Sequence, residues 1–247
     1  MKILLAPSET KKQGGSENFD LNSLLFQELT PIRKKLLHQY INILQKNSFS
    51  ELSKIFGLKK ESDINYHNRD IIHELTMKAI ERYRGVAFDY LNYKDLEKDS
   101  QIYIDKNVLL CSNLFGFLRA DDLIPEYRLK QGMPIGELRP EKFYKEQSHL
   151  MEEYLKDEDI LDLRAGFYNK FYKPTKNYTT LKFMKNGKVV SHWAKAYRGI
   201  VLKEIAIAKI NTLEEFMNLS IETLTIKEIQ KRKNKTEIIY EIEVVVF

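Results

Sequence analysis

The sequence predicts an α+β fold: a single domain in which helices surround a mixed β-sheet with antiparallel hairpins. Helix-like and strand-like segments follow one another without the regular alternation that a doubly wound sheet or an α/β barrel requires. Two hairpins are predicted near the carboxyl terminus, and a hairpin pairs its strands antiparallel. The chain has no Gly/Ser/Pro-rich linker and no internal repeat, so we expect residues 1–247 to form one domain.

The first predicted elements are a buried strand and a helix. Residues 2–6 are a short, mainly apolar run that Pro7 ends, as expected of a strand. Thr30 and Pro31 are a typical N-cap and first helical residue. The stripe of that helix that should face the core consists of Ile32, Leu36, Tyr40 and Leu44.

A shorter helix is predicted from an N-cap at Ser50 to a stop at Gly57. Hydrophobic residues flank this glycine, Lys59 and Lys60 follow it, and another helix comes next. Residues 50–84 therefore have the outline of a helix-hairpin-helix, in which a glycine turn and its lysines bind DNA phosphates. The alternative is an ordinary helix with a glycine C-cap, because that gives the same pattern.

The middle of the chain is predicted to be mainly helical. A helix over residues 68–84 closes at Gly85. Residues 86–92 open a new element, a strand that leads into a short helix. A helix over residues 96–107 then leads to a buried strand that starts at Val108.

The carboxyl-terminal half contains the clearest local signals. A helix is predicted from His149 to Leu155 and a strand from Ile160 to Leu163. Residues 181–193 form two strand-like runs around Asn186 and Gly187, which favours a type I′ hairpin turn because both central positions need positive φ.

A helix over residues 195–210 follows that hairpin. The chain then ends in a second hairpin, with a strand from about Glu222, a turn at Lys233–Lys235 and a strand from Glu237 to Val246. Polar residues interrupt the apolar ones in this last strand, as expected of a strand that is half buried.

The segment from Cys111 to Pro134 is predicted to be an irregular loop with polar side chains directly after the buried strand. Such segments often form functional sites. In one interpretation Arg119 and Arg128 belong to a site. In the other, they pair with Asp121 and Asp122 and only hold the loop in place.

Composition indicates a soluble globular protein, with 43% hydrophobic and 30% charged residues. A single cysteine excludes an internal disulfide framework and a multi-thiolate metal site. The apolar run after Met1 is too short for a secretory signal, and no run reaches the roughly 18 to 20 apolar residues of a membrane helix. We therefore expect a cytoplasmic protein with no membrane partner.

Positive charge is concentrated in residues 164–209, which contain 11 Lys or Arg and one acid, whereas the rest of the chain contains 29 basic and 34 acidic residues. Such a block is a candidate surface for phosphate-bearing partners, and a solvated basic face is the alternative. Lys195 and Arg198 share one face of the predicted helix in its first turn, where backbone N–H groups are free. Together they would form an anion site.

The residue pattern shows no catalytic constellation, and we expect no metal and no cofactor. No nucleophile has an adjacent base, and no glycine-rich phosphate loop is present. The groups able to polarise a substrate and move a proton belong to Asp121, Tyr127, Arg128 and Lys195. The five histidines are scattered, without metal-ligand spacing, at positions 38, 67, 73, 149 and 192. Cys111 ends an apolar run, so we predict a buried core thiol and not a peroxide sensor.

The chain contains four motifs in order: Ser8–Lys11, Ser112–Arg119, Tyr127–Met133 and Ala194–Gly199. Together they resemble the motifs of the YaaA family of bacterial peroxide stress proteins, over most of the chain. The resemblance implies a YaaA-type single-domain α+β fold, a positively charged cleft, binding to double-stranded DNA and a helix-hairpin-helix-like element. It also implies a role in limiting damage from unincorporated iron during peroxide stress.

The resemblance assigns the cleft to the loop after the first strand, the central loop and the start of the late helix. Its expected binding residues are Ser8, Thr10, Lys11, Arg119, Asp121, Tyr127, Arg128, Lys195 and Arg198, with Gly199 completing the last motif. Glu9 stands where other members can carry a lysine, and we expect Lys11 to supply that charge. The hairpin maps loosely onto residues 55–60, and its expected DNA contacts are Gly57, Lys59 and Lys60.

Two functions from different classes follow. The first is a cytoplasmic, monomeric stress-response protein that binds DNA through the basic cleft. The alternative is an enzyme of unidentified reaction that acts on a small anionic metabolite or nucleotide in the same cleft.

Overall fold

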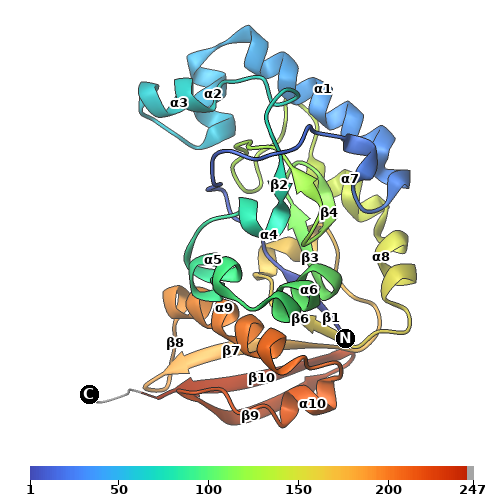
Figure 1. Ribbon diagram of the computed structural model, residues 1–247, viewed down its shortest axis with the longest axis vertical. Coiled ribbons are helices and arrows are strands. Elements are labelled where there is room, and N and C mark those ends of the chain that lie inside the picture. Colours follow the sequence, from blue (N-terminus) through green and yellow to red (C-terminus); the bar gives the residue numbers. More distant parts are fainter. Residues whose placement is uncertain (244–247) are drawn as a thin grey trace.

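The computed structural model describes residues 1–243, except for the side chains of Ser191 and His192. Most strands join one mixed sheet: β1 (Lys2–Leu5), β3 (Val108–Ser112), β4 (Gly116–Arg119), β6 (Ile160–Asp162), β7 (Tyr178–Lys185), β8 (Lys188–Val189), β9 (Leu224–Arg232) and β10 (Lys235–Ile242). Their order is β4-β3-β1-β6-β7-β10-β9, and β8 pairs with β7 (Figure 1). A two-stranded sheet pairs β2 (Met77–Lys78) with β5 (Leu123–Ile124).

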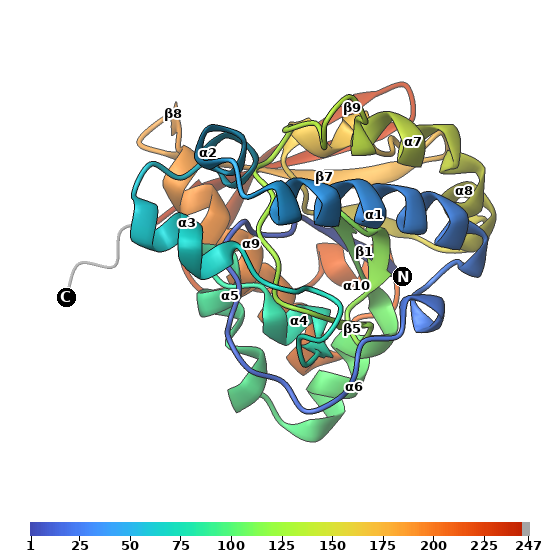
Figure 2. The same cartoon turned by 90° about the horizontal axis from the view of Figure 1, so that it is seen from above.

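Helices surround this sheet, which confirms the predicted α+β class. They are α1 (Thr30–Lys46), α2 (Phe49–Phe56), α3 (Glu61–His67), α4 (Ala79–Arg82), α5 (Val86–Leu91), α6 (Lys98–Asn107), α7 (Pro140–Glu146), α8 (Ser148–Leu155), α9 (Ser191–Ala208) and α10 (Leu213–Met217). Short 3-10 turns lie at Leu21–Ser23, Gln27–Leu29, Tyr93–Asp95 and Gly166–Lys170. Figure 1 shows α1 to α3 at one end of the molecule and β7, β9 and β10 at the other. Figure 2, seen from above, shows α2, α3, α5 and α9 on one side, and α7 and α8 on the opposite side.

The centre of the main sheet is parallel. β1 pairs in parallel with β3 and β6, and β7 pairs in parallel with β6 and β10. All residues of β1, β3 and β6 are buried, as expected of parallel strands that are covered on both faces. Because these strands run the same way, their carboxyl ends lie at one edge of the sheet, which is where open parallel sheets bind ligands.

Both predicted hairpins are confirmed. Asn186 and Gly187 have φ values of 51° and 72° between β7 and β8, as a type I′ turn requires. The second hairpin joins β9 to β10 through a turn in which Lys233 has a φ of 53°. The predicted last strand extended to Val246, and residues 244–246 lie outside the described part of the chain.

The predicted helix over residues 68–84 is wrong, because only α4 within it is helical and β2 precedes α4. Thr76 pairs instead with the amino-terminal loop, and its backbone N–H donates to the Glu17 carbonyl at 2.7 Å. The buried guanidinium of Arg82 donates to three backbone carbonyls, those of Lys12, Leu75 and Ile124. These long-range bonds outweigh the local helix propensity.

Three predicted helix starts also differ from the structure. Ser48, not Ser50, precedes α2. Thr30 lies within α1, and its buried hydroxyl has no hydrogen-bond partner among the described residues. α9 begins at Ser191, so Lys195 lies beyond its first turn. The backbone amides near Lys195 are therefore inside the helix, and the predicted contribution of free amides to an anion site is wrong.

Two segments gain or lose strands relative to the prediction. The central segment is not wholly irregular, since it contains β4 and β5. The Ser112 hydroxyl accepts from the N–H groups of Leu114 and Phe115, and Gly116 has a φ of 72°, which together close a tight turn between β3 and β4. Residues 86–91 form α5 without a preceding strand.

Candidate functional site

A cavity of about 530 Å³ opens at the carboxyl ends of β1 and β6, beside α5 and α9. We call it the apolar hollow, because most of its lining side chains are hydrophobic. It is lined by Leu5, Ala6, Pro7, Ser8, Glu9, Gly85, Val86, Ala87, Phe88, Gln131, Leu163, Ala165, Tyr168, Lys195 and Arg198. The residues come from five separate segments, which the fold brings together.

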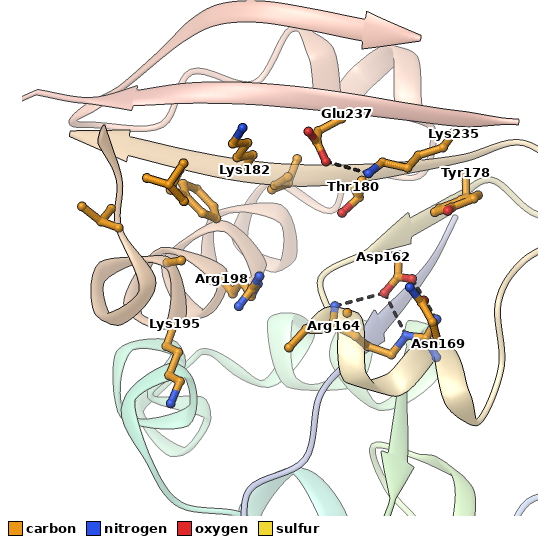
Figure 3. A pocket seen from close by; sticks show the side chains of 17 residues that line it. Asp162, Arg164, Asn169, Tyr178, Thr180, Lys182, Lys195, Arg198, Lys235 and Glu237 are labelled. Carbon is orange, nitrogen blue, oxygen red and sulfur yellow. Dashed lines mark hydrogen bonds and ion pairs between the residues drawn. The ribbon is translucent and has the colours of Figure 1, made fainter. Parts of the chain in front are cut away.

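A second cavity of about 470 Å³ lies between β7, the loop after β6 and α9 (Figure 3). We call it the polar hollow, because charged and polar side chains line it, among them Asp162, Arg164, Asn169, Thr180, Lys182, Lys235 and Glu237. The two hollows share Ala165, Lys195 and Arg198, so they adjoin at these residues.

Lys195 and Arg198 extend from α9 and lack an acidic partner. Among the described side chains, no carboxylate oxygen lies within 4 Å of either cation. Lys195 is exposed and Arg198 is half-buried. Arg198 extends toward the loop that carries Arg164, whereas Lys195 extends away from the sheet (Figure 3). Burial lowers the pKa of Arg198, which nevertheless stays charged at neutral pH because its ordinary pKa is 12.5.

The acids that line the hollows are all neutralised. Asp162 binds the guanidinium of Arg164 with both oxygens, at 2.8 Å each, and the pair is buried. Glu237 pairs with Lys235 at 2.7 Å. Glu9, in the apolar hollow, accepts from the backbone N–H of Gln131 at 2.8 Å and lies 3.7 Å from the guanidinium of Arg128. The unpaired charge of the joined hollows is therefore positive.

Gly199 allows α9 to pack closely against α5. A Cβ at this position would lie 2.0 Å from the carbonyl oxygen of Ala87, so only glycine allows the two helices to approach this closely. Ala87 lines the apolar hollow, and Arg198 precedes Gly199. The last motif of the sequence therefore supplies both a cation and the close contact that positions it.

The loop after β1 places its three predicted site residues differently. Ser8 lines the apolar hollow, and its hydroxyl accepts from the exposed Thr10 N–H at 3.3 Å. Lys11 is buried, donates to the carbonyls of Ser8 and Glu9 at 3.2 and 3.3 Å, and lies 3.9 Å from the centre of the Tyr127 ring. Burial, and next the charge of Arg128, lowers the pKa of Lys11 to about 7. Lys11 is therefore a buried amine and does not line either hollow.

Tyr127 belongs to a buried chain of hydroxyls. Its hydroxyl lies 2.7 Å from that of Ser112 and 3.0 Å from that of Tyr83. Burial raises the pKa of Tyr127 to about 12, so its phenol keeps its proton at neutral pH. These hydroxyls connect the central loop to the end of β3 and to the residue that follows α4.

Arg128 connects the central loop to two other segments. Its Nε donates to the carbonyl of Phe56 at 2.9 Å, at the end of α2, and its other end faces Glu9. Beside it, burial lowers the pKa of His67 to about 4, with the charge of Arg128 as the second cause. This histidine is therefore neutral at physiological pH.

Arg119 and Asp121 are not brought together with the other predicted residues. They pair with each other at 3.1 Å and line a separate hollow beside Lys2, at the amino end of β1. The reason is that β4 runs antiparallel to β3 and carries the chain back to that end of the sheet. Their geometry matches the interpretation in which these charges hold the loop.

The hairpin segment consists of α2, a turn at Gly57 and α3. Gly57 has a φ of 65°, and Lys59 and Lys60 are exposed. Backbone bonds attach the segment to the central loop, because the Lys130 N–H donates to the Ile55 carbonyl at 2.8 Å. Figures 1 and 2 show α2, α3, α5 and α9 toward the same lateral side, with α2 and α3 near one end of the long axis and α9 near the other.

Several lining residues were missed from the sequence. Asp162 lies near the end of a predicted strand and Arg164 follows that strand directly, and polar residues at such a point were a signal available in the sequence. Phe88 gave no such signal, and Tyr168 and Lys182 were marked only as members of the basic block at residues 164–209, because their contribution depends on how distant segments pack.

The described residues give little support for a metal site, a reactive thiol or a membrane-spanning helix. They contain no group of three or more His, Cys, Asp or Glu side chains that could hold a metal ion. Cys111 is buried as predicted, and burial raises the pKa of its thiol to about 12, which keeps it protonated. No described helix combines the length and the apolar character that crossing a membrane requires.

Comparison with known proteins identifies relatives along nearly the whole chain. A family model described as peroxide stress protein YaaA matches residues 1–230. A Campylobacter jejuni protein, described as uncharacterized, is 47% identical over 244 residues, which cover 98% of this chain and 99% of that relative. A UPF0246 protein of Corynebacterium glutamicum is 33% identical and covers 89% of this chain and 91% of its own. A UPF0246 protein of Fusobacterium nucleatum is 29% identical, with coverage of 95% and 97%.

Proposed function

This chain belongs to the family of the peroxide stress protein YaaA, and we propose that it is a cytoplasmic, monomeric protein that binds double-stranded DNA during peroxide stress. In this proposal its basic cleft contacts the phosphate backbone, and DNA binding limits the damage that unincorporated iron causes. The family supports the role in peroxide stress. The DNA contact is supported by the charges described above.

The observation that carries the proposal is that two cations on α9 have no carboxylate partner among the described side chains. Lys195 and Arg198 face an open cleft in which every lining acid is already neutralised. Arginine binds two phosphate oxygens at once, and lysine adds a point charge. A cleft of this kind attracts a polyanion without reading its sequence.

The hairpin segment supports a second contact with the same DNA. Lys59 and Lys60 are exposed between α2 and α3, and these two helices lie toward the same lateral side of the molecule as α9. The backbone bond between Ile55 and Lys130 attaches the end of α2 to the central loop, which limits the movement of the turn that carries these lysines. In this proposal, residues 55–60 contact one part of the backbone and α9 contacts another.

Fluorescence anisotropy with a labelled duplex tests the proposal. Binding dominated by phosphate contacts weakens steeply with salt, with a slope of log K against log[salt] of about −0.9 for each neutralised phosphate. We expect similar affinity for duplexes of unrelated sequence and a slope of about −3 to −4, one contact for each of the four cations. Affinity that does not respond to salt would contradict the proposal.

Protection of DNA is tested by plasmid nicking with Fe²⁺ and hydrogen peroxide. The wild-type protein should reduce nicking under low-salt conditions in which it coats the plasmid. The double variant Lys195→Ala/Arg198→Ala should protect less, in proportion to its weaker binding. Equal protection by both proteins would separate the effect on damage from DNA binding in this cleft.

A second candidate function is favoured by the shape of the hollows. Cavities of about 470 and 530 Å³ have the size of small-ligand sites, and the apolar hollow has walls that a duplex backbone does not use. In this candidate, the protein is an enzyme that acts on a small anionic metabolite. Ligand-induced stabilisation in a thermal-shift screen of acidic metabolites, lost in Arg198→Ala, would favour it.

A further inference from the structure

We propose that the two hollows together bind a nucleotide, with its phosphate between Lys195 and Arg198 and its base in the apolar hollow beside Phe88 and Tyr168. The inference deepens the proposed DNA function and rests on it in one respect, because the same two cations hold phosphate in both. The proposed site is a recess for a single nucleotide, next to the surface that would bind the DNA phosphate backbone.

The position of the phosphate follows from charge. Lys195 and Arg198 are the cations that both hollows share, so a group bound between them reaches both cavities. The Asp162 carboxylate, which would repel an anion there, is bound on both oxygens by Arg164. Lys182 adds a further charge to the polar hollow, where a sugar or a second phosphate would lie.

The position of the base follows from the lining of the apolar hollow. Phe88 and Tyr168 contribute aromatic rings, and the loops after β1 and β6 contribute aliphatic side chains. The Ser8 hydroxyl and the Gln131 side chain add polar groups, which suits the edge of a base. Apolar walls with a few convergent polar groups are typical of small-molecule sites, and planar rings fit between such walls.

The size of the site selects the form of the nucleotide. Both cavities fall within the range of roughly 300 to 1,000 Å³ that small-ligand sites occupy. A base inside a duplex is stacked and cannot enter a recess unless it leaves the helix. The ligand is therefore a free nucleotide or a nucleotide of a single strand, and both present the same base and phosphate.

Isothermal titration calorimetry with three probes tests the site. The full chain is titrated with adenosine 5′-monophosphate, with adenosine and with inorganic phosphate. We expect the monophosphate to bind at least about tenfold more tightly than either of its parts, since only the whole nucleotide uses both the cations and the hollow. Equal affinity for phosphate and monophosphate would overturn the assignment of the base, and no binding by any probe would overturn the proposal.

Variants around the proposed phosphate position between Lys195 and Arg198 make the test more specific. Arg198→Ala should weaken monophosphate binding about tenfold or more, and Arg198→Lys should recover part of that loss because it keeps the charge without the planar fork. Ala165→Leu should weaken binding by filling the junction of the hollows. Lys203→Ala, on the same helix but away from both hollows, is the matched control and should bind as the wild type does. Melting curves without ligand confirm that each variant is folded.

Competition identifies the source of the nucleotide. A single-stranded oligonucleotide that displaces the monophosphate assigns the site to a nucleotide within a strand, and one that fails to displace it assigns the site to a free nucleotide. Duplex binding without monophosphate binding would overturn this inference and leave the DNA function standing. Monophosphate binding without duplex binding would leave this inference standing and overturn the DNA function.

Discussion

The molecule has two basic regions, the turn between α2 and α3 and the start of α9, and they differ in shape. Lys59 and Lys60 stand on an exposed turn, whereas Lys195 and Arg198 stand at the junction of two hollows. Exposed charges attract any phosphate and are screened by salt within about 8 Å under physiological conditions. Charges beside apolar walls also respond to the shape of the bound group. The comparison indicates that the turn contributes affinity for phosphate, whereas the hollows select the ligand by its shape.

The largest effect should come from the buried pair that supports the hollows. Asp162→Ala leaves the Arg164 guanidinium buried without its carboxylate, which should cost about 3–5 kcal/mol in the free energy of unfolding. Urea unfolding measures this loss. The matched control is Glu153→Ala, which breaks an exposed pair with Lys156 and should cost less than about 1 kcal/mol. Equal losses would mean that the pair under the hollows is no more important than a surface pair.

The next effect concerns the buried amine of Lys11. Its folded-state pKa of about 7 is lower than its ordinary value of 10.5, so the unfolded chain binds more protons between these pH values. The free energy of unfolding should therefore rise with pH from about 7 to 10, by on the order of 3 kcal/mol, and this contribution is lost again as the pH falls to 7. Lys11→Met should flatten this rise, measured by urea unfolding at several pH values, whereas Lys203→Met should leave it unchanged.

A smaller loss should follow from Gly199→Ala. The added Cβ would meet the Ala87 carbonyl and push α5 away from α9, which should cost about 1–3 kcal/mol as other overpacked sites do. Monophosphate binding should also weaken, because Ala87 lines the apolar hollow. Gly166→Ala is the control for stability alone, since nothing lies within 4 Å of a Cβ there but Gly166 lines the polar hollow. A stable Gly199→Ala variant with unchanged binding would show that the helices can separate without consequence for the site.

The smallest effect should come from the exposed turn. Lys59→Ala/Lys60→Ala removes two exposed charges, so we expect the salt slope of duplex binding to change by about 2 and the stability to change little. Monophosphate binding should not change, because neither lysine lines a hollow. A loss of monophosphate binding in this variant would remove the distinction between the two regions.

Local signals in the sequence were enough for both hairpins and for most strands of the main sheet, although β4 was missed. The apolar runs at the start of the chain and at Val108 became β1 and β3, and Asn186–Gly187 formed the expected turn. These features depend on a few neighbouring residues, and so a single sequence contains them.

The errors arose where distant contacts decide the structure. Residues 68–84 have a helical pattern, but Thr76 pairs with the amino-terminal loop and Arg82 binds backbone carbonyls far along the chain. Arg119 has a residue type that suits a phosphate site, yet the turn after β3 carries it to the other end of the sheet. Of the predicted site residues, Ser8, Lys195 and Arg198 line the hollows, and Lys11, Tyr127 and Arg128 lie behind them.

The most direct test of the central proposal is the salt dependence of duplex binding by Lys195→Ala/Arg198→Ala, compared with Lys203→Ala in the same helix. If these two cations bind phosphates, the double variant should lose at least about tenfold in affinity at low salt, and the magnitude of its slope should fall by about 2. The Lys203→Ala control should retain the wild-type slope. An unchanged slope and affinity in the double variant would contradict the assignment of this cleft to phosphate.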